Sequence, residues 1–263
     1  MRPLATIVIC YLILVLVFAL AWFWQVRTRN AGMVDPIWAL SLGLVAVLYA
    51  VLCDGDLTAR WTTGVLGGLW GTRLGAYLWR RNIGEPEDGR YARFREQWGV
   101  SANKNMFWLF QLQAVFSMLF SLAFLVAARQ PAAPSHACLL GAALIWLVSV
   151  GGEGLADRQL RAFKADPANK GHVCRAGLWR YSRHPNYFFE CLHWFSYVAL
   201  AFGSPWVWAT LIAPVLMAWL LLKVSGIALT EAQSARSRPD YAEYIRTTSA
   251  FIPWPPKRTT KPM

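Results

Sequence analysis

The chain has 263 residues, of which 56% are hydrophobic and 15% are charged, and it contains 15 tryptophans. This composition excludes an ordinary soluble domain, in which roughly a quarter of the residues are charged. A net charge of +12 is compatible with nucleic acid as a partner, but the positions of the basic residues along the chain argue against it.

Seven apolar runs follow one another along the chain, and most of them approach or exceed the ~20 residues that cross a bilayer as a helix. They cover residues 4–26, 33–53, 62–79, 106–128, 137–154, 187–203 and 205–229. In the first run Ala19-Leu20-Ala21 is similar to a signal-peptidase site, but the apolar character continues through Trp24, which predicts an uncleaved helix. The sequence therefore predicts an all-α, polytopic integral membrane protein with about seven spanning helices.

Lysine and arginine concentrate in every second loop between these runs. The basic segments are residues 27–29, 80–104, 158–183 and 236–261, whereas residues 54–60, 129–136 and 203–204 are poor in basic side chains. By the positive-inside rule, this alternation predicts an N-terminus outside and a C-terminus in the cytoplasm. Topology, anionic lipid and an anionic cofactor account for the basic loops, so nucleic acid is not expected as a partner.

Residues 177–190, at the start of the sixth run, form the densest polar stretch of the chain. Arg183 offers a fork of donors that suits phosphate oxygens. Asn186 can both donate and accept hydrogen bonds, as a nicotinamide carboxamide requires, and Pro185 suits the first turn of a helix. Glu190 lies one turn further on, where a carboxylate is costly in a bilayer. A basic patch that binds lipid head groups needs the arginines, but not Asn186 or Glu190.

Further polar side chains lie in the fifth run and in the tail. Glu153 and Asp157 share one helical face, where they can accept ribose hydroxyls or pair with arginines. His193 follows Glu190 by three residues, so a mutual hydrogen bond is expected. The histidines and the five cysteines have no metal-ligand spacing, so no metal site is expected. Residues 236–246 place two tyrosines between arginines, which suits either a nucleotide or an amphipathic helix on the membrane surface.

Several of these motifs resemble the bacterial branch of the steroid 5α-reductase family. The matching segments are residues 177–190, 225–227 with Glu231, 238–241 and 251–257. The resemblance is strongest over residues 153–257 and thin over residues 1–130. It implies a monomeric, multi-pass reductase of the bacterial inner membrane that uses NADPH to saturate the C4–C5 double bond of a 3-oxo-Δ4 steroid or a similar enone lipid. It further implies one domain, with residues 1–130 on the substrate side and residues 131–263 forming the cofactor site.

The resemblance also implies roles for individual residues. Asn186 and Glu190 stand at an Asn-x-x-x-Glu of the family, and Arg73 and Tyr77 at an Arg-x-x-x-Tyr of its third helix. The expected cofactor-binding residues are Glu153, Asp157, Arg158, Arg161, Lys164, Arg183, His184, Asn186, Tyr187, Arg238, Tyr241, Tyr244 and Arg246. Catalysis is expected of Asp35, Tyr77 and Glu190, and substrate contact of Trp38, Trp70 and Arg73.

The chain departs from the eukaryotic members at two of these positions. Asp35 stands where those members place a Gln-Glu pair, and Trp70 stands near the place of their catalytic tyrosine. The sequence therefore does not identify the residue that donates the proton. Asp35, desolvated near the membrane, can act as an acid directly or through a tyrosine or water.

Two other functions compete with the reductase. Residues 183–187 also match an Arg-His-Pro-x-Tyr motif of the isoprenylcysteine methyltransferase family, which implies an S-adenosylmethionine-dependent membrane methyltransferase. That cofactor has no pyrophosphate, so the dense arginines favour NADPH. The third alternative is a non-catalytic sterol- or lipid-binding membrane protein. A nucleotide that copurifies with the protein would distinguish the three.

Overall fold

The computed structural model describes residues 3–224 and 226–257, and almost all of its ordered elements are helices. Strand-like pairing among these described residues is limited to one isolated parallel bridge between Ser182 and Ser249. The predicted all-α, polytopic membrane fold is confirmed. The chain forms two compact units, Met1–His136 with Leu200–Ala213, and Ala137–Ala199 with Pro214–Met263. The expected single reductase domain stays a prediction.

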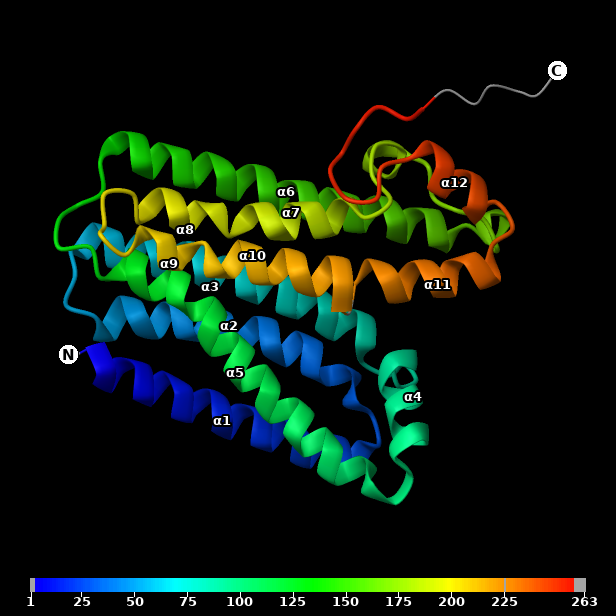
Figure 1. Cartoon of the computed structure of the whole chain (residues 1–263), viewed down its shortest axis with the longest axis horizontal. Helices are drawn as coiled ribbons and strands as arrows, with labels where there is room; N and C mark the ends of the chain where they lie inside the picture. The colour runs from blue at the N-terminus through cyan, green and yellow to red at the C-terminus, as the bar shows by residue number, and fades with distance from the viewer. Residues whose placement is uncertain (1–2, 225, 258–263) are drawn as a thin grey trace. The chain divides into compact units, whose positions relative to one another are not determined.

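The first unit is a set of long helices closed at one end by a short one. Its elements are α1 (Pro3–Thr28), η1 (Ala31–Met33), α2 (Val34–Leu52), α3 (Leu57–Asn82), α4 (Gly89–Trp98), η2 (Gly99–Ser101), α5 (Ala102–Ala128) and α9 (Val207–Thr210). Figure 1 shows α4 linking the end of α3 to the start of α5. Large apolar side chains such as Phe18, Trp70 and Phe120 are fully buried and form the core.

Glycines and alanines let α2 and α3 approach closely. A Cβ atom on Gly71 would lie 2.6 Å from the backbone oxygen of Ala39 and 2.7 Å from the Cα of Gly43. Small residues allow such backbone contact between helices in a bilayer, where dispersion and weak polar contacts replace the hydrophobic effect as the cause of association.

The second unit holds the polar stretch identified in the sequence. Its elements are α6 (His136–Ala165), η3 (Pro167–Asn169), η4 (Gly177–Arg180), α7 (Pro185–His193), α8 (Phe195–Leu200), α10 (Ile212–Trp219), η5 (Leu220–Val224), α11 (Ile227–Ser237) and α12 (Tyr241–Thr247). Within this unit α7 lies alongside α6, and α12 lies near the loop segment that precedes α7 (Figure 1). Ser225 of the family motif lies outside the described residues.

Within residues 3–224 and 226–257, five helical stretches are long and apolar enough to cross a membrane. They are Pro3–Thr28, Ala31–Leu52, Gly89–Ala128, His136–Ala165 and Val207–Val224. The other two of the seven predicted spans are also helical. However, α3 carries glycines and arginines, and the sixth is divided by Trp194 into α7 and α8. The exact number of spans and their orientation stay predictions.

Two helices differ in length from the apolar runs that predict them. α6 continues past residue 154 to Ala165, because its last turns are polar but still helical. The seventh run does not continue as one helix to residue 229: it ends at Val224 in the π-helical turn η5, and α11 begins at Ile227. Hydropathy marks where a helix enters the apolar layer, whereas the end of a helix depends on capping and local packing.

Candidate functional site

The polar stretch enters α7 through His184 and Pro185. Pro185 is the first residue of α7, as predicted, and His184 lies outside the helical region, which a residue before proline avoids. The loop before it is fixed to α6. Gln159 accepts a hydrogen bond from the backbone N–H of Leu178 at 2.9 Å, and its side chain occupies the space that a Cβ on Gly177 would need. Gly177 also has φ +55°, which favours glycine.

Asn186 and Asp157 join the start of α7 to α6. Nδ2 of Asn186 donates to Oδ1 of Asp157 at 3.3 Å. Five residues earlier on α6, a Cβ on Gly152 would lie 2.5 Å from the ring of Phe189, so the two helices touch there. Contacts 157–186 and 152–189 run in opposite directions along the two helices, which are therefore antiparallel.

Two buried carboxyl groups lie one turn deeper than this contact. Glu190 follows Asn186 by one turn of α7, and Glu153 precedes Asp157 by one turn of α6. Both glutamates are buried. The antiparallel packing brings the level of Glu153 to the level of Glu190. The site thus has an amide and a carboxyl at its mouth and two carboxyls further inside.

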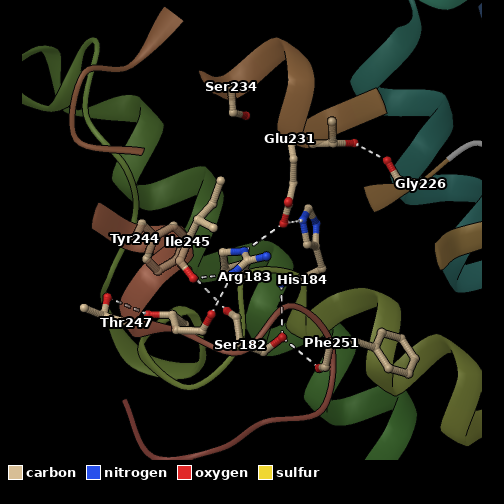
Figure 2. Close-up of polar contacts among 12 residues, drawn as sticks. Ser182, Arg183, His184, Gly226, Glu231, Ser234, Tyr244, Ile245, Thr247 and Phe251 are labelled. Carbon is tan, nitrogen blue, oxygen red and sulfur yellow. Dashed lines mark hydrogen bonds and ion pairs between the residues drawn. The ribbon is translucent and has the colours of Figure 1, made fainter. Parts of the chain in front are cut away.

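A half-buried glutamate binds the two basic residues that precede α7 (Figure 2). Oε1 of Glu231, on α11, lies 2.7 Å from Nε of Arg183 and 3.2 Å from Nε2 of His184. The ring of His184 also stacks on Tyr187 at 5.1 Å between centroids. Burial opposes ionisation of Glu231, but the hydrogen bonds from His184 and Arg183 outweigh it and lower the pKa of this carboxyl.

Arg183 also holds the end of α12. Its Nη1 donates to the backbone oxygens of Ile245 at 2.9 Å and Thr248 at 2.7 Å (Figure 2). Positive charge at a helix C-terminus interacts favourably with the helix dipole and satisfies carbonyls that have no helical partner. Arg183 and His184 were expected to bind a cofactor. They lie in a network within the protein, and their contact with a cofactor stays a prediction.

The C-terminal segment is bound directly to the residues before α7. The hydroxyl of Ser182 donates to the backbone oxygen of Phe251 at 2.8 Å. The backbone N–H of Arg183 donates to the backbone oxygen of Ser249, also at 2.8 Å. Further along, the N–H of Trp254 donates to the oxygen of Tyr181 at 2.9 Å. The segment 249–254 therefore forms a strap across the entry to α7.

Tyr241 and Tyr244 lie in a small core rather than on an open surface. Together with Val173 they form a buried cluster, and the hydroxyl of Tyr244 donates to the backbone oxygen of Trp179. Burial raises the pKa of Tyr241 to about 12, and it also raises the pKa of Tyr244. Arg246, on the same helix, is exposed. The predicted role of these residues in cofactor binding stays a prediction.

Three of the predicted basic residues lie beyond the apolar part of α6. Arg158 and Arg161 are exposed on α6. Lys164 and Arg238 line a hollow of about 440 Å³ together with Lys170 and His172. Such a concentration of cations suits a phosphate-bearing ligand. The remaining lining residues are Leu160, Phe163, Ala165, Asp166, Pro167, Asn169, Gly171 and Cys174.

The first unit contains the residues expected to meet the substrate. Oδ2 of Asp35 lies 2.7 Å from Nη2 of Arg90, and Oδ1 accepts a hydrogen bond from the hydroxyl of Tyr91 at 3.1 Å. Arg90 also pairs with Asp88, at 3.0 Å. Asp35 therefore fastens the start of α2 to α4.

The tryptophans predicted to line a pocket do lie together. Trp38 contacts Trp70 edge to face at 6.0 Å between centroids. The guanidinium of Arg81 lies over the ring of Tyr77 at 5.9 Å. Arg73 is half-buried one turn before Tyr77 on α3. The catalytic and substrate-binding roles expected of Asp35, Tyr77, Trp38, Trp70 and Arg73 stay predictions.

Three partners were not identified from the sequence. Arg90 and Glu231 are separated from their partners by long stretches of chain, so no local spacing indicates the pairs. Tyr197 is different, because it follows His193 by one helical turn and its hydroxyl lies 3.0 Å from Nε2 of His193. That spacing could have identified the pair.

One comparison with known proteins gave a match. A protein-family model described as "Protein of unknown function (DUF1295)" matches residues 21–248. The comparisons with curated proteins and with solved structures found no match.

Proposed function

Because the chain belongs to the DUF1295 family, which is related to steroid 5α-reductase-like membrane proteins, we propose that it is an NADPH-dependent reductase of enone lipids. The substrate class is a 3-oxo-Δ4 steroid or a similar flat, apolar enone. The observation that carries the proposal is the polar site between α6 and α7, where Asn186 contacts Asp157 and Glu190 is buried one turn deeper. Binding of a lipid head group does not require such a set of residues.

Cofactor binding is assigned to the polar ends of α6 and α7 and to the basic residues near them. Asn186 has the donor and acceptor that a carboxamide needs. Lys164 and Arg238, which share the hollow beyond α6, suit phosphate groups. Bound NADPH would supply the hydride that adds to the β-carbon of the enone. The pair formed by Arg183 and Glu231 keeps the entry to α7 in place.

The reduction also needs polarisation of the substrate ketone and a proton for its α-carbon. Asp35 enters the proposal as a carboxylate that pairs with Arg90 and accepts a hydrogen bond from the hydroxyl of Tyr91. Both carboxylate oxygens of Asp35 are thus engaged by side chains of α4. Asp35 therefore suits the positioning of a neighbouring donor better than the donation of a proton itself.

The test combines nucleotide binding with turnover. Purified protein is titrated with NADPH and, in parallel, with S-adenosylmethionine while its melting temperature is recorded. We expect stabilisation by NADPH and NADPH-dependent reduction of progesterone or testosterone. Stabilisation by S-adenosylmethionine alone would favour a methyltransferase, and an absence of both effects would favour a lipid-binding protein.

The site itself is tested by two substitutions. Asn186→Ala is expected to weaken NADPH binding, because it removes the amide at the mouth of the site. Glu190→Gln is expected to lower turnover more than the melting temperature. Wild-type reduction by both variants would contradict the assignment of this site.

A further inference from the structure

Three titratable side chains follow one another along a single buried face of the sixth predicted span. Glu190 and His193 lie on α7 and Tyr197 on α8, at spacings of three and four residues, so their side chains are stacked along one face. Their exposed fractions are 7%, 1% and 0%. Ionisable groups at such depth in a spanning segment are costly and commonly mark a functional path.

The deeper two groups are joined directly. Nε2 of His193 lies 3.0 Å from the hydroxyl of Tyr197. The indole of Trp194 packs against both rings, with centroids 5.0 Å from His193 and 6.0 Å from Tyr197. This packing holds the imidazole and the phenol in one arrangement and keeps water away from them.

Another buried carboxyl lies on α6 at the level of the outer group. Glu153 is buried on α6 at the level of Glu190, because α6 and α7 are antiparallel and touch at Gly152 and Phe189. Two buried carboxyls at one level cannot both be ionised at low cost, so the proposal places a proton on one of them. His193 and Tyr197 lie one and two turns further along the same face.

We propose that Glu190, His193 and Tyr197 form a proton-transfer chain that carries the proton of the enone reduction from the basic end of α7 into the spanning segment. The inference rests on the proposed reductase function. It assigns the proton donor, which the sequence leaves open, to Tyr197, and it makes His193 a positioning residue that acts through Tyr197.

The transfer balances as follows in protons and electrons. Hydride addition to the β-carbon, with NADPH as the hydride donor, moves the double-bond electrons toward the ketone oxygen. The α-carbon then takes the hydroxyl proton of Tyr197. Tyr197 regains a proton from Nε2 of His193. Nδ1 of His193, which has no direct hydrogen bond to Glu190, would then take the proton of that carboxyl across one helical turn. Water at the basic end of α7 protonates the Glu190 carboxylate, so each turnover consumes one hydride and one proton.

The same hydrogen bond also has a purely structural explanation, since polar side chains stabilise packed helices in a bilayer. Tyr197→Phe separates the two explanations because it removes only the hydroxyl. The matched control is Ser196→Ala, which removes a buried hydroxyl from the neighbouring residue. We expect Tyr197→Phe to lower kcat by about 10²-fold or more with KM and NADPH affinity preserved, and Ser196→Ala to retain kcat. Equal kcat in the two variants would overturn the proposal.

A second measurement does not depend on turnover. The carbonyl stretch of a protonated carboxyl group is resolved from carboxylate bands by infrared spectroscopy, and deuterium oxide shifts it. We expect one such band to be lost in Glu190→Gln and displaced in His193→Gln, but unchanged in Ser196→Ala. If the position of this band is the same in His193→Gln as in the wild type, the proposed proton-transfer chain is wrong. A displaced band in a protein that reduces no enone would retain the chain and reject the reductase function.

Discussion

At the scale of single residues, the ion pair between Arg183 and Glu231 gives the clearest prediction for the stability of the protein. Arg183 is 9% exposed and reaches both Glu231 and the end of α12. Removal of one partner from a buried ion pair leaves a charge without compensation, which costs about 3–5 kcal/mol. An exposed ion pair contributes only about 0–1 kcal/mol.

Glu231→Gln is therefore expected to lower the melting temperature and to loosen the strap formed by residues 249–254. Glu243→Gln is the control, because the side chain of Glu243 is 43% exposed in its pair with Arg175. Thermal unfolding and limited proteolysis near the C-terminus measure the two effects. An equal loss of stability in both variants would contradict the structural role given to Glu231.

The same residue gives a pH dependence of defined sign. In the folded protein the pKa of Glu231 is lowered from its ordinary value of 4.5, so the folded state binds fewer protons there than the unfolded state. The stabilisation is complete above the ordinary value and is lost as the pH falls through the lowered pKa. We expect the melting temperature of the wild type to fall more steeply below about pH 4.5 than that of Glu231→Gln. If the difference in melting temperature between the wild type and Glu231→Gln does not change with pH, the pKa of Glu231 is not lowered by folding.

Asp35 has a separate residue-scale prediction. Asp35→Asn removes the charge that pairs with Arg90 but retains the shape of the side chain. If this group positions a donor that polarises the substrate ketone, turnover falls by about 10²-fold while NADPH affinity is retained. Glu87→Gln is the control, since Glu87 pairs with Arg95 of the same helix α4 at 2.8 Å. Preserved turnover per folded molecule, with a lower melting temperature in both variants, would mean that Asp35 only fastens α4.

At the scale of helices, the contact between α2 and α3 depends on the absence of side chains. Gly71→Leu would force the backbones apart, because even a Cβ would lie 2.6 Å from the oxygen of Ala39. Overpacking of this kind costs about 1–3 kcal/mol or more. Gly141→Leu on α6 is the control, since nothing lies within 4 Å of the Cβ position there. Thermal unfolding in detergent should show a lower melting temperature for Gly71→Leu alone.

The sequence predicted the helices better than the contacts between them. Apolar runs indicated the spans, and the spacing of Asn186 and Glu190 correctly placed both on one helix that begins at Pro185. The division of the sixth span at Trp194 was not predicted, because a single helical turn of altered geometry leaves the apolar pattern unchanged. The pairs formed by Arg183 with Glu231 and by Asp35 with Arg90 depend on how distant segments pack, which periodicity does not encode.

At the scale of the whole molecule, the distribution of basic loops predicts a topology that labelling can test. Glu96→Cys on α4 and Ala132→Cys between α5 and α6 both introduce an exposed thiol. By the positive-inside rule, a membrane-impermeant thiol reagent should reach position 132 from outside intact cells and position 96 only after the membrane is opened. The unsubstituted protein gives the background labelling of its own cysteines. The reverse labelling pattern would show that the orientation is opposite to the predicted one.

The strap has a consequence for the order of synthesis. The residues that hold the entry to α7 come from segments 249–254 and from the end of α12, whose last residue is Thr247. A ribosome makes α7 before it makes these segments, so the mouth of the site stays open until they have been synthesised. A stop codon that removes only the last dozen or so described residues would therefore spare every predicted span, yet release the entry to the site.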